Sequence, residues 1–142
     1  MTEFNAEQVS VKEQGNVFSL LDSPIANSFY RDRSRISYIQ GAFGTGKTVT
    51  SVQKAILLAQ EQEVNAQGIR KTRIAVVRNT FAQLMDTTVR TWLDWFPPGE
   101  WGTYLKSANN YDMRWVRDDD DTIVELQVWF RGLDRPDQVS NL

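Results

Sequence analysis

Apolar residues recur along this chain with two different spacings, and each spacing predicts a different kind of element. Two stretches carry the helical spacing i, i+3, i+4, i+7. The first is expected to begin at about Lys47 and has its apolar stripe at Val49, Val52, Ala55, Ile56 and Ala59. The second has its stripe at Phe81, Leu84, Met85, Thr88, Trp92 and Phe96. A capping box of Thr80 and Gln83 starts the second helix, and Pro97-Pro98-Gly99 ends it.

Other stretches are typical of strands. Residues 35–40 are rich in β-branched and aromatic side chains, and residues 74–77 form the continuous apolar run of a strand buried in a parallel sheet. Residues 111–117 and 122–131 predict a β-hairpin with a turn at 118–121, and one face of its second strand consists of Val124, Leu126, Val128 and Phe130. The order strand, helix, strand, helix predicts an α/β fold with a central, largely parallel sheet, plus this hairpin near the C-terminus.

A glycine-rich motif joins the first expected strand to the first expected helix. It fits G-x-x-x-x-G-K-[ST] and consists of Gly41, Ala42, Phe43, Gly44, Thr45, Gly46, Lys47 and Thr48. Such a loop wraps backbone N–H groups around phosphate oxygens, with Lys47 expected at the β- and γ-phosphates and the Thr48 hydroxyl on Mg²⁺. The alternative is a glycine-rich turn without chemical use, but the strand–loop–helix context favours a nucleoside triphosphate. A dinucleotide fingerprint is excluded because Val49 stands where a third small residue is needed.

The bulk composition excludes several kinds of chemistry. Cysteine and histidine are both absent, which excludes disulfides, thiolate or imidazole zinc sites and imidazole bases. The formal net charge is −2, so any nucleic-acid contact would come from a local patch. Two basic clusters, at 31–35 and 70–73, each precede an expected strand and fit either phosphate-backbone contact or solvated loops. No stretch has the length of a membrane span.

Three smaller features have two interpretations each. The four aspartates at 118–121 fit a solvated hairpin turn better than a metal site, because adjacent aspartates in a turn diverge and repel. Phe29 or Tyr30 would either flank an adenine ring or pack against the first strand. The five tryptophans are expected to pack in the core rather than to stack on nucleobases.

The carboxylates needed for hydrolysis are not found in the sequence. Phosphoryl transfer beside a phosphate loop uses an aspartate at the end of a second buried strand, and no apolar run here ends in paired acids. Asp134 lies four residues beyond the last expected strand position. We therefore expect residues 1–142 to be the N-terminal portion of a longer P-loop ATPase domain, the half that contains the phosphate loop.

Four stretches in order resemble one family, the large terminase subunit of tailed bacteriophages. They are 41–48, 76–81, the helix that reaches 92–98, and 129–135 with its F-R-G-L-D-R run. The resemblance implies a RecA-like ATPase of the additional-strand type that uses ATP and Mg²⁺ to drive double-stranded DNA into a procapsid. It also implies a homo-oligomeric ring at the portal vertex in the host cytoplasm, with the portal protein and the small terminase subunit as partners. The family's Walker B strand and nuclease domain would lie downstream of residue 142.

Arg78 occupies the place of a family arginine that is a candidate for reaching the γ-phosphate of a neighbouring subunit. The alternative is that Arg78 pairs with a local carboxylate. Ala42 and Phe43 depart from the family, because many members have an arginine inside the loop that acts within the same chain. Two other functions stay open: a helicase- or recombinase-type ATPase, and a truncated, non-catalytic nucleotide-binding or assembly module.

Overall fold

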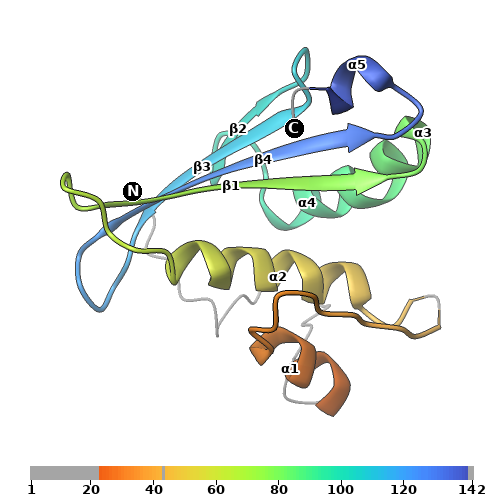
Figure 1. The fold of residues 1–142 in the computed structure, drawn as a ribbon. Coiled ribbons are helices and arrows are strands. Elements are labelled where there is room, and N and C mark those ends of the chain that lie inside the picture. The colour runs from red at the N-terminus through yellow and green to blue at the C-terminus, as the bar shows by residue number, and fades with distance from the viewer. Residues whose placement is uncertain (1–22, 43, 141–142) are drawn as a thin grey trace.

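The computed structural model describes residues 23–42 and 44–140, so the arm expected at residues 1–16 lies outside the described residues. These residues form an α/β structure with one four-stranded sheet (Figure 1). The described elements in chain order are α1 (Pro24–Arg31), α2 (Lys47–Gln60), β1 (Ile69–Arg78), α3 (Phe81–Gln83), η3 (Leu84–Val89), α4 (Arg90–Trp95), β2 (Gly102–Leu105), β3 (Asn110–Val116), β4 (Ile123–Gly132) and α5 (Pro136–Val139).

The sheet is mixed, with the strand order β1-β4-β3-β2. Only β1 and β4 pair in parallel, whereas β3 pairs antiparallel with both β4 and β2. The expected largely parallel sheet is therefore wrong for the described residues. The reason is the length of the connections, since short turns between β2, β3 and β4 impose antiparallel pairing, while parallel strands need a long crossover. The expected hairpin near the C-terminus is confirmed as β3 and β4.

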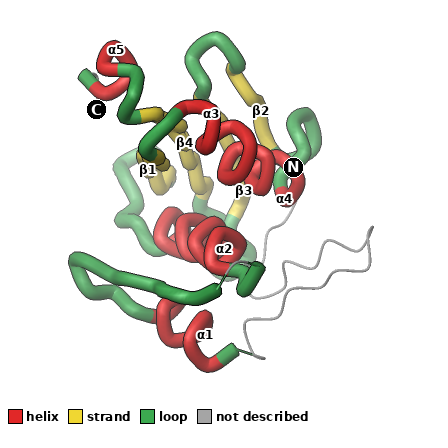
Figure 2. Tube along the Cα trace, turned by 90° about the vertical axis from the view of Figure 1, so that its right-hand side faces the viewer, coloured by secondary structure: helices red, strands yellow, loops and turns green. Residues whose placement is uncertain are grey.

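Helices cover one face of the sheet. α2 lies along β1, and the continuous helical segment made of α3, η3 and α4 covers the rest of that face (Figures 1 and 2). The middle turn of that segment is a π-helix. The core lies between these layers. The expected common face of β4 is confirmed, and it points into this core, with exposed fractions of at most 1% at Val124, Leu126, Val128 and Phe130. Trp92 packs at the centre of the core, with its ring about 6 Å from the rings of Tyr111 and Phe130.

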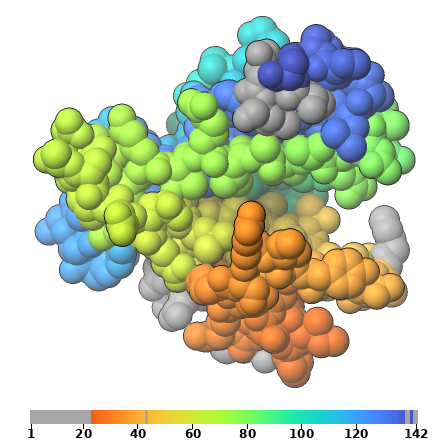
Figure 3. All heavy atoms as spheres, in the orientation of Figure 1, coloured from red at the N-terminus to blue at the C-terminus, as the bar shows by residue number. Residues whose placement is uncertain are grey.

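Two strand expectations need correction. Residues 35–40 form no strand, and Ile36 and Tyr38 are 85% and 79% exposed. With α1, this segment lies on the side of α2 that faces away from the sheet, as a lobe beneath α2 in the space-filling view (Figures 1 and 3). β1 is longer than residues 74–77, and Val77 is 39% exposed because the second face of the sheet has no helical layer among the described residues beyond the short α5, which contacts β4.

The helix boundaries follow the sequence closely. Ser23 caps α1 by accepting a hydrogen bond from the Ala26 amide, and Pro24 fills the first helical position. Thr80 accepts a hydrogen bond from the Gln83 amide, which confirms the expected cap of the second helix. No described helix has the length and apolar character required to cross a membrane.

Candidate nucleotide site

The described part of the loop at 41–48 has the backbone conformation that glycine allows. Gly44 and Gly46 both have a φ of +77°, a region that L-residues with a Cβ rarely adopt. Gly46 is the N-cap of α2, and its carbonyl accepts the first helical hydrogen bond from the Thr50 amide at 2.9 Å. The loop therefore leads directly into the N-terminus of a 14-residue helix, where free N–H groups and the positive end of the helix dipole favour an anion.

Lys47 lies folded over this loop. Its Nζ donates to the Gly41 carbonyl at 2.8 Å, to the Ala42 carbonyl at 2.5 Å and to Thr45 Oγ1 at 3.3 Å. Thr45 in turn donates to the Ala42 carbonyl at 2.8 Å. These contacts close the loop around its own ammonium group. The same ammonium is the charge that phosphate oxygens would attract, so a phosphate would compete with the two carbonyls for it.

Arg78 lies at the same end of the molecule as this loop. α2 begins where β1 and β4 end, so the helix N-terminus and the carboxyl ends of both strands share one edge of the structure (Figure 1). Val76 packs against the core, and strand alternation places Arg78 on the same, helix-covered face. Arg78 is exposed, and no described residue forms an ion pair or side-chain hydrogen bond with it. The expected alternative, a local carboxylate partner, is therefore not found among residues 23–42 and 44–140.

The carboxylate after β4 has a structural partner. Asp134 Oδ1 accepts a hydrogen bond from the Phe81 amide at 2.8 Å, so it caps the start of α3. No group of three or more acidic side chains in the described part of the chain is arranged to hold a metal ion. The side chain of Thr48, expected to ligate Mg²⁺, is half-buried in the first turn of α2.

The aspartates at 118–121 lie in the β3–β4 turn and pair with arginines. Asp120 accepts from Arg70 at 2.8 Å, and Arg117 pairs with Asp119. A hydrogen bond from the Thr122 hydroxyl is the main reason why the pKa of Asp120 is lowered to about 2. These contacts support the solvated turn.

The basic clusters do not form one rim. Arg70 to Arg73 lie within β1 rather than before it, so the expected position of this cluster is wrong. Arg33 forms a forked pair with Glu61, with distances of 2.7 and 2.8 Å. Arg33 and Arg70 both have carboxylate partners, which would compete with a nucleic-acid phosphate for these guanidinium groups.

The segment before the loop is anchored to α2 by Lys54. This lysine is 8% exposed, and its Nζ donates to the Phe29 carbonyl and to Ser37 Oγ, each at 2.9 Å. Its ammonium also lies 4.2 Å from the centre of the Phe29 ring. Phe29 and Tyr38 help to line a hollow of about 370 Å³, whereas Tyr30 is buried. Of the two aromatic candidates for an adenine ring, only Phe29 is thus accessible, and one of its faces is already occupied.

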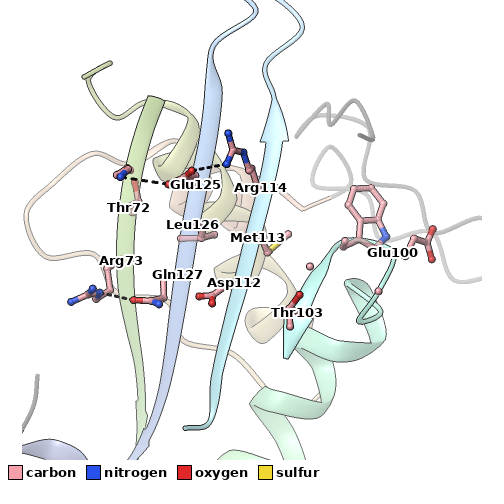
Figure 4. Close-up of a pocket in the computed structure, with 14 residues that line it drawn as sticks. Thr72, Arg73, Glu100, Thr103, Asp112, Met113, Arg114, Glu125, Leu126 and Gln127 are labelled. Atoms are coloured by element: carbon pink, nitrogen blue, oxygen red, sulfur yellow. Dashed lines mark hydrogen bonds and ion pairs between the residues drawn. The ribbon is translucent and has the colours of Figure 1, made fainter. Parts of the chain in front are cut away.

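Sequence reasoning did not identify a second hollow, which lies on the uncovered face of the sheet. It has a volume of about 830 Å³ and polar residues from all four strands along it (Figure 4). The side chains form rows across the strands: Lys71 and Arg114 flank Glu125, and Arg73 donates to Gln127 at 2.8 Å. The period-2 alternation of β4 places Glu125 and Gln127 on the face opposite Val124 and Leu126, but the partners of these rows come from strands far apart in sequence.

Comparison of the chain with protein-family models, with curated proteins and with solved structures found no match. The fold and the loop define an α/β protein in which a glycine-rich loop opens a 14-residue helix beside the carboxyl ends of two parallel strands.

Proposed function

We propose that residues 41–48 bind the phosphates of a nucleoside triphosphate, ATP with Mg²⁺, as the nucleotide-binding part of a viral DNA-packaging ATPase. One observation carries the nucleotide proposal: two glycines at φ +77° lead into the N-terminus of α2, with Lys47 and Thr48 in its first turn. This arrangement supplies backbone donors, a helix dipole and a cation at one point, which is the chemistry that a polyphosphate requires.

Each residue of the loop has a proposed role. Lys47 would exchange its bonds to the Gly41 and Ala42 carbonyls for bonds to the β- and γ-phosphates, so binding would replace neutral acceptors by charged ones. Thr48 would present its hydroxyl to the Mg²⁺ that bridges the phosphates. Gly44 and Gly46 would let the backbone approach the anion, with Ala42, Phe43 and Thr45 as the intervening loop positions.

The packaging role rests on the resemblance to large terminase subunits and is a more specific proposal than nucleotide binding. It includes a RecA-like, additional-strand ATPase domain, translocation of double-stranded DNA, a ring of identical subunits, and contacts with the portal protein and the small terminase subunit at the procapsid. The F-R-G-L-D-R run that carries the resemblance spans the end of β4 and the turn after it, next to the end of β1. The resemblance implies that Arg78 would supply a second cation to the nucleotide site of a neighbouring subunit.

Nucleotide binding is tested by titrating the ¹⁵N-labelled chain with ATPγS and Mg²⁺. We expect the amide signals of the loop and of the first turn of α2 to shift, and we expect Lys47→Ala to weaken binding about ten- to a hundredfold through loss of a charged hydrogen bond. The control is Lys106→Ala, which removes an exposed lysine from the β2–β3 turn. Unmoved loop amides at millimolar ATPγS would exclude the site.

Binding without turnover is a second function that one contact favours. Asp134, the carboxylate that follows β4, uses its Oδ1 to hold the start of α3, which favours a structural role for it over positioning Mg²⁺ or water. This chain would then bind ATP but hydrolyse it slowly. Rapid, Mg²⁺-dependent phosphate release by the purified chain, abolished by Lys47→Ala, would contradict this and favour a complete ATPase.

A further inference from the structure

The loop at 41–48 contains a single cation, Lys47. A triphosphate and its developing charge are commonly neutralised by more than one cation. Arg78 is the exposed arginine at the carboxyl end of β1, on the helix-covered face and at the end where α2 begins (Figure 1). It has no partner among the described residues, so its guanidinium is available for an anion.

The backbone on both sides of Arg78 is fixed. Before it, the β1–β4 ladder holds the strand up to the pair Arg78 and Gly132. After it, the turn Gly132–Arg135, here termed the clamp, binds the chain as it leaves the strand. The Leu133 amide donates to the Arg78 carbonyl at 2.9 Å, and the Asp134 amide donates to the Asn79 carbonyl at 3.2 Å. The clamp thus continues the pairing beyond the sheet.

Side chains of the clamp hold the start of α3 as well. Asp134 Oδ1 accepts from the Phe81 amide at 2.8 Å, and the Arg135 guanidinium lies 3.7 Å from the centre of the Phe81 ring. Gly132 makes this approach possible. A Cβ at Gly132 would lie 2.7 Å from both Asp134 Oδ1 and the Phe81 nitrogen, closer than a real Cβ contact allows. The glycine and the aspartate of the F-R-G-L-D-R run therefore act as one unit.

We propose that Arg78 contacts the γ-phosphate of the nucleotide bound by its own chain, and that Gly132 and Asp134 are positioning residues that hold Arg78 there. The inference rests on the proposed nucleotide site. It differs from the role implied by the terminase resemblance, in which the arginine reaches a neighbouring subunit. The proposal also explains how the site obtains a second cation although the loop holds only Lys47. Arg78 lies 31 positions after Lys47, and the βα topology returns it to the same edge of the sheet.

The test compares the affinities of the monomeric chain for Mg²⁺–ATPγS and Mg²⁺–ADP, with the oligomeric state checked by sedimentation. Only the first ligand carries a γ-phosphate, so the contact is measured by the ratio Kd(ADP)/Kd(ATPγS), here termed the ATPγS-to-ADP ratio, which falls when ATPγS binds more weakly. We expect Arg78→Ala to reduce this ratio about tenfold or more while ADP affinity changes less than about twofold. Arg114→Ala, which removes an exposed arginine on the opposite face of the sheet, is the matched control.

Substitutions at Asp134 test the clamp. Asp134→Glu keeps the charge but moves the carboxylate by one methylene, and we expect it to lower the ATPγS-to-ADP ratio as Arg78→Ala does. Asp134→Asn keeps an oxygen that accepts from the Phe81 amide, and we expect it to retain the ratio within about twofold. A purely structural clamp would change the thermal midpoint or both affinities together, not their ratio. In the Arg78→Ala background, Asp134→Glu should have no further effect on the ratio.

The outcomes separate the proposals. If the unchanged chain binds neither nucleotide, the proposed function fails and this inference fails with it. If both nucleotides bind but Arg78→Ala leaves the ratio unchanged, the nucleotide site stands and the same-chain role of Arg78 is overturned. If Arg78→Ala lowers the ratio but Asp134→Glu does not, the clamp is overturned. The clamp is also overturned if Asp134→Asn lowers the ATPγS-to-ADP ratio while Asp134→Glu leaves it unchanged. The charge of residue 134, rather than its position, would then set the ratio.

Discussion

Single polar side chains hold the segment before the loop against α2. Lys54 shows this most directly, because its buried ammonium bonds one backbone carbonyl and one hydroxyl from residues 29–37. A buried charge is costly unless it is hydrogen-bonded. Removal of the Lys54 donor would leave the Phe29 carbonyl with only the Asp32 amide, at 3.3 Å, and would remove the donor to Ser37 Oγ. Lys54 therefore contributes to the placement of residues that lead into the glycine loop.

Lys54→Met tests this contribution, because methionine keeps most of the volume but removes the donor. We expect the free energy of unfolding to fall by about 2 kcal/mol, the usual magnitude for hydrogen bonds of a charged group. Urea denaturation monitored by tryptophan fluorescence gives the value. Lys106→Met, at an exposed lysine, should change it by less than about 0.5 kcal/mol. Equal effects of the two substitutions would contradict the anchoring role.

Hydrogen bonds lower the pKa of two aspartates, Asp32 and Asp120, and so make the stability of the fold depend on pH. The pKa of Asp120 is lowered to about 2, chiefly by the Thr122 hydroxyl, and the pKa of Asp32 is lowered to about 2, chiefly by the Ser34 hydroxyl. Since the folded pKa lies below the ordinary value of 3.8, each group stabilises the folded state above about pH 4. That contribution is lost as the pH falls towards 2.

Each substitution should act on its own aspartate. We expect Thr122→Val to raise the pKa of Asp120 towards 3.8 and to leave Asp32 at about 2, with the reverse result for Ser34→Ala. Carboxyl ¹³C titration of the folded protein measures both values in one sample. If either substitution moved both aspartates, a general change in the fold rather than a local hydrogen bond would be the cause.

At the scale of elements, buried hydrogen bonds connect the hairpin to the helical layer. Tyr111 on β3 is fully buried, and its hydroxyl donates to the Phe96 carbonyl at 2.7 Å, just beyond the end of α4. We expect Tyr111→Phe to lower the free energy of unfolding by about 1–2 kcal/mol, because the carbonyl stays buried without this donor. Tyr38→Phe, at a 79% exposed position, is the control and should be neutral. A neutral Tyr111→Phe would show that the contact adds no net stability.

Elements whose signals are local could be predicted from the sequence. The stripe that begins with Phe81, the cap at Thr80 and the alternation of β4 each depend on neighbours within a few residues, and all three are confirmed. Residues 35–40 carried an equally local signal and form no strand. A strand is stable only when another strand pairs with its edge, and no local pattern specifies that partner.

The candidate site divides in the same way. The motif at 41–48 predicted glycines with special backbone angles and a helix starting at Lys47, since both follow from adjacent residues. The clamp joins Phe81 to Asp134, which are 53 positions apart, so composition and spacing contain no signal for it. The sequence identified the F-R-G-L-D-R run only by resemblance, and the structure provides its physical basis in the close approach at Gly132.

At the scale of the whole molecule, the two faces of the sheet differ in what they contribute. One face is buried beneath α2 and the α3–η3–α4 segment, whereas the other has no such helical layer among the described residues and carries the polar rows (Figures 2 and 4). Apart from the short α5, which contacts β4, no described helix packs on that second face. Stability in such a two-layer structure comes mainly from the apolar face. The open face is available for functions that need accessible charge.

Adjacent residues of β4 allow a direct comparison of these faces. Glu125 lies 3.1 Å from Arg114 and 3.9 Å from Lys71, but all three side chains are at least 31% exposed, so water and salt screen the pairs. We expect Glu125→Gln to change the free energy of unfolding by less than about 1 kcal/mol. Leu126 is the next residue along β4 and is 1% exposed. We expect Leu126→Ala to lower the free energy of unfolding by about 2–5 kcal/mol, because apolar burial is lost and a cavity is left behind. Urea denaturation at low and high salt measures both. If Glu125→Gln lowered the free energy of unfolding as much as Leu126→Ala does, the charged rows would stabilise the sheet as strongly as the core. That result would contradict the argument from exposure.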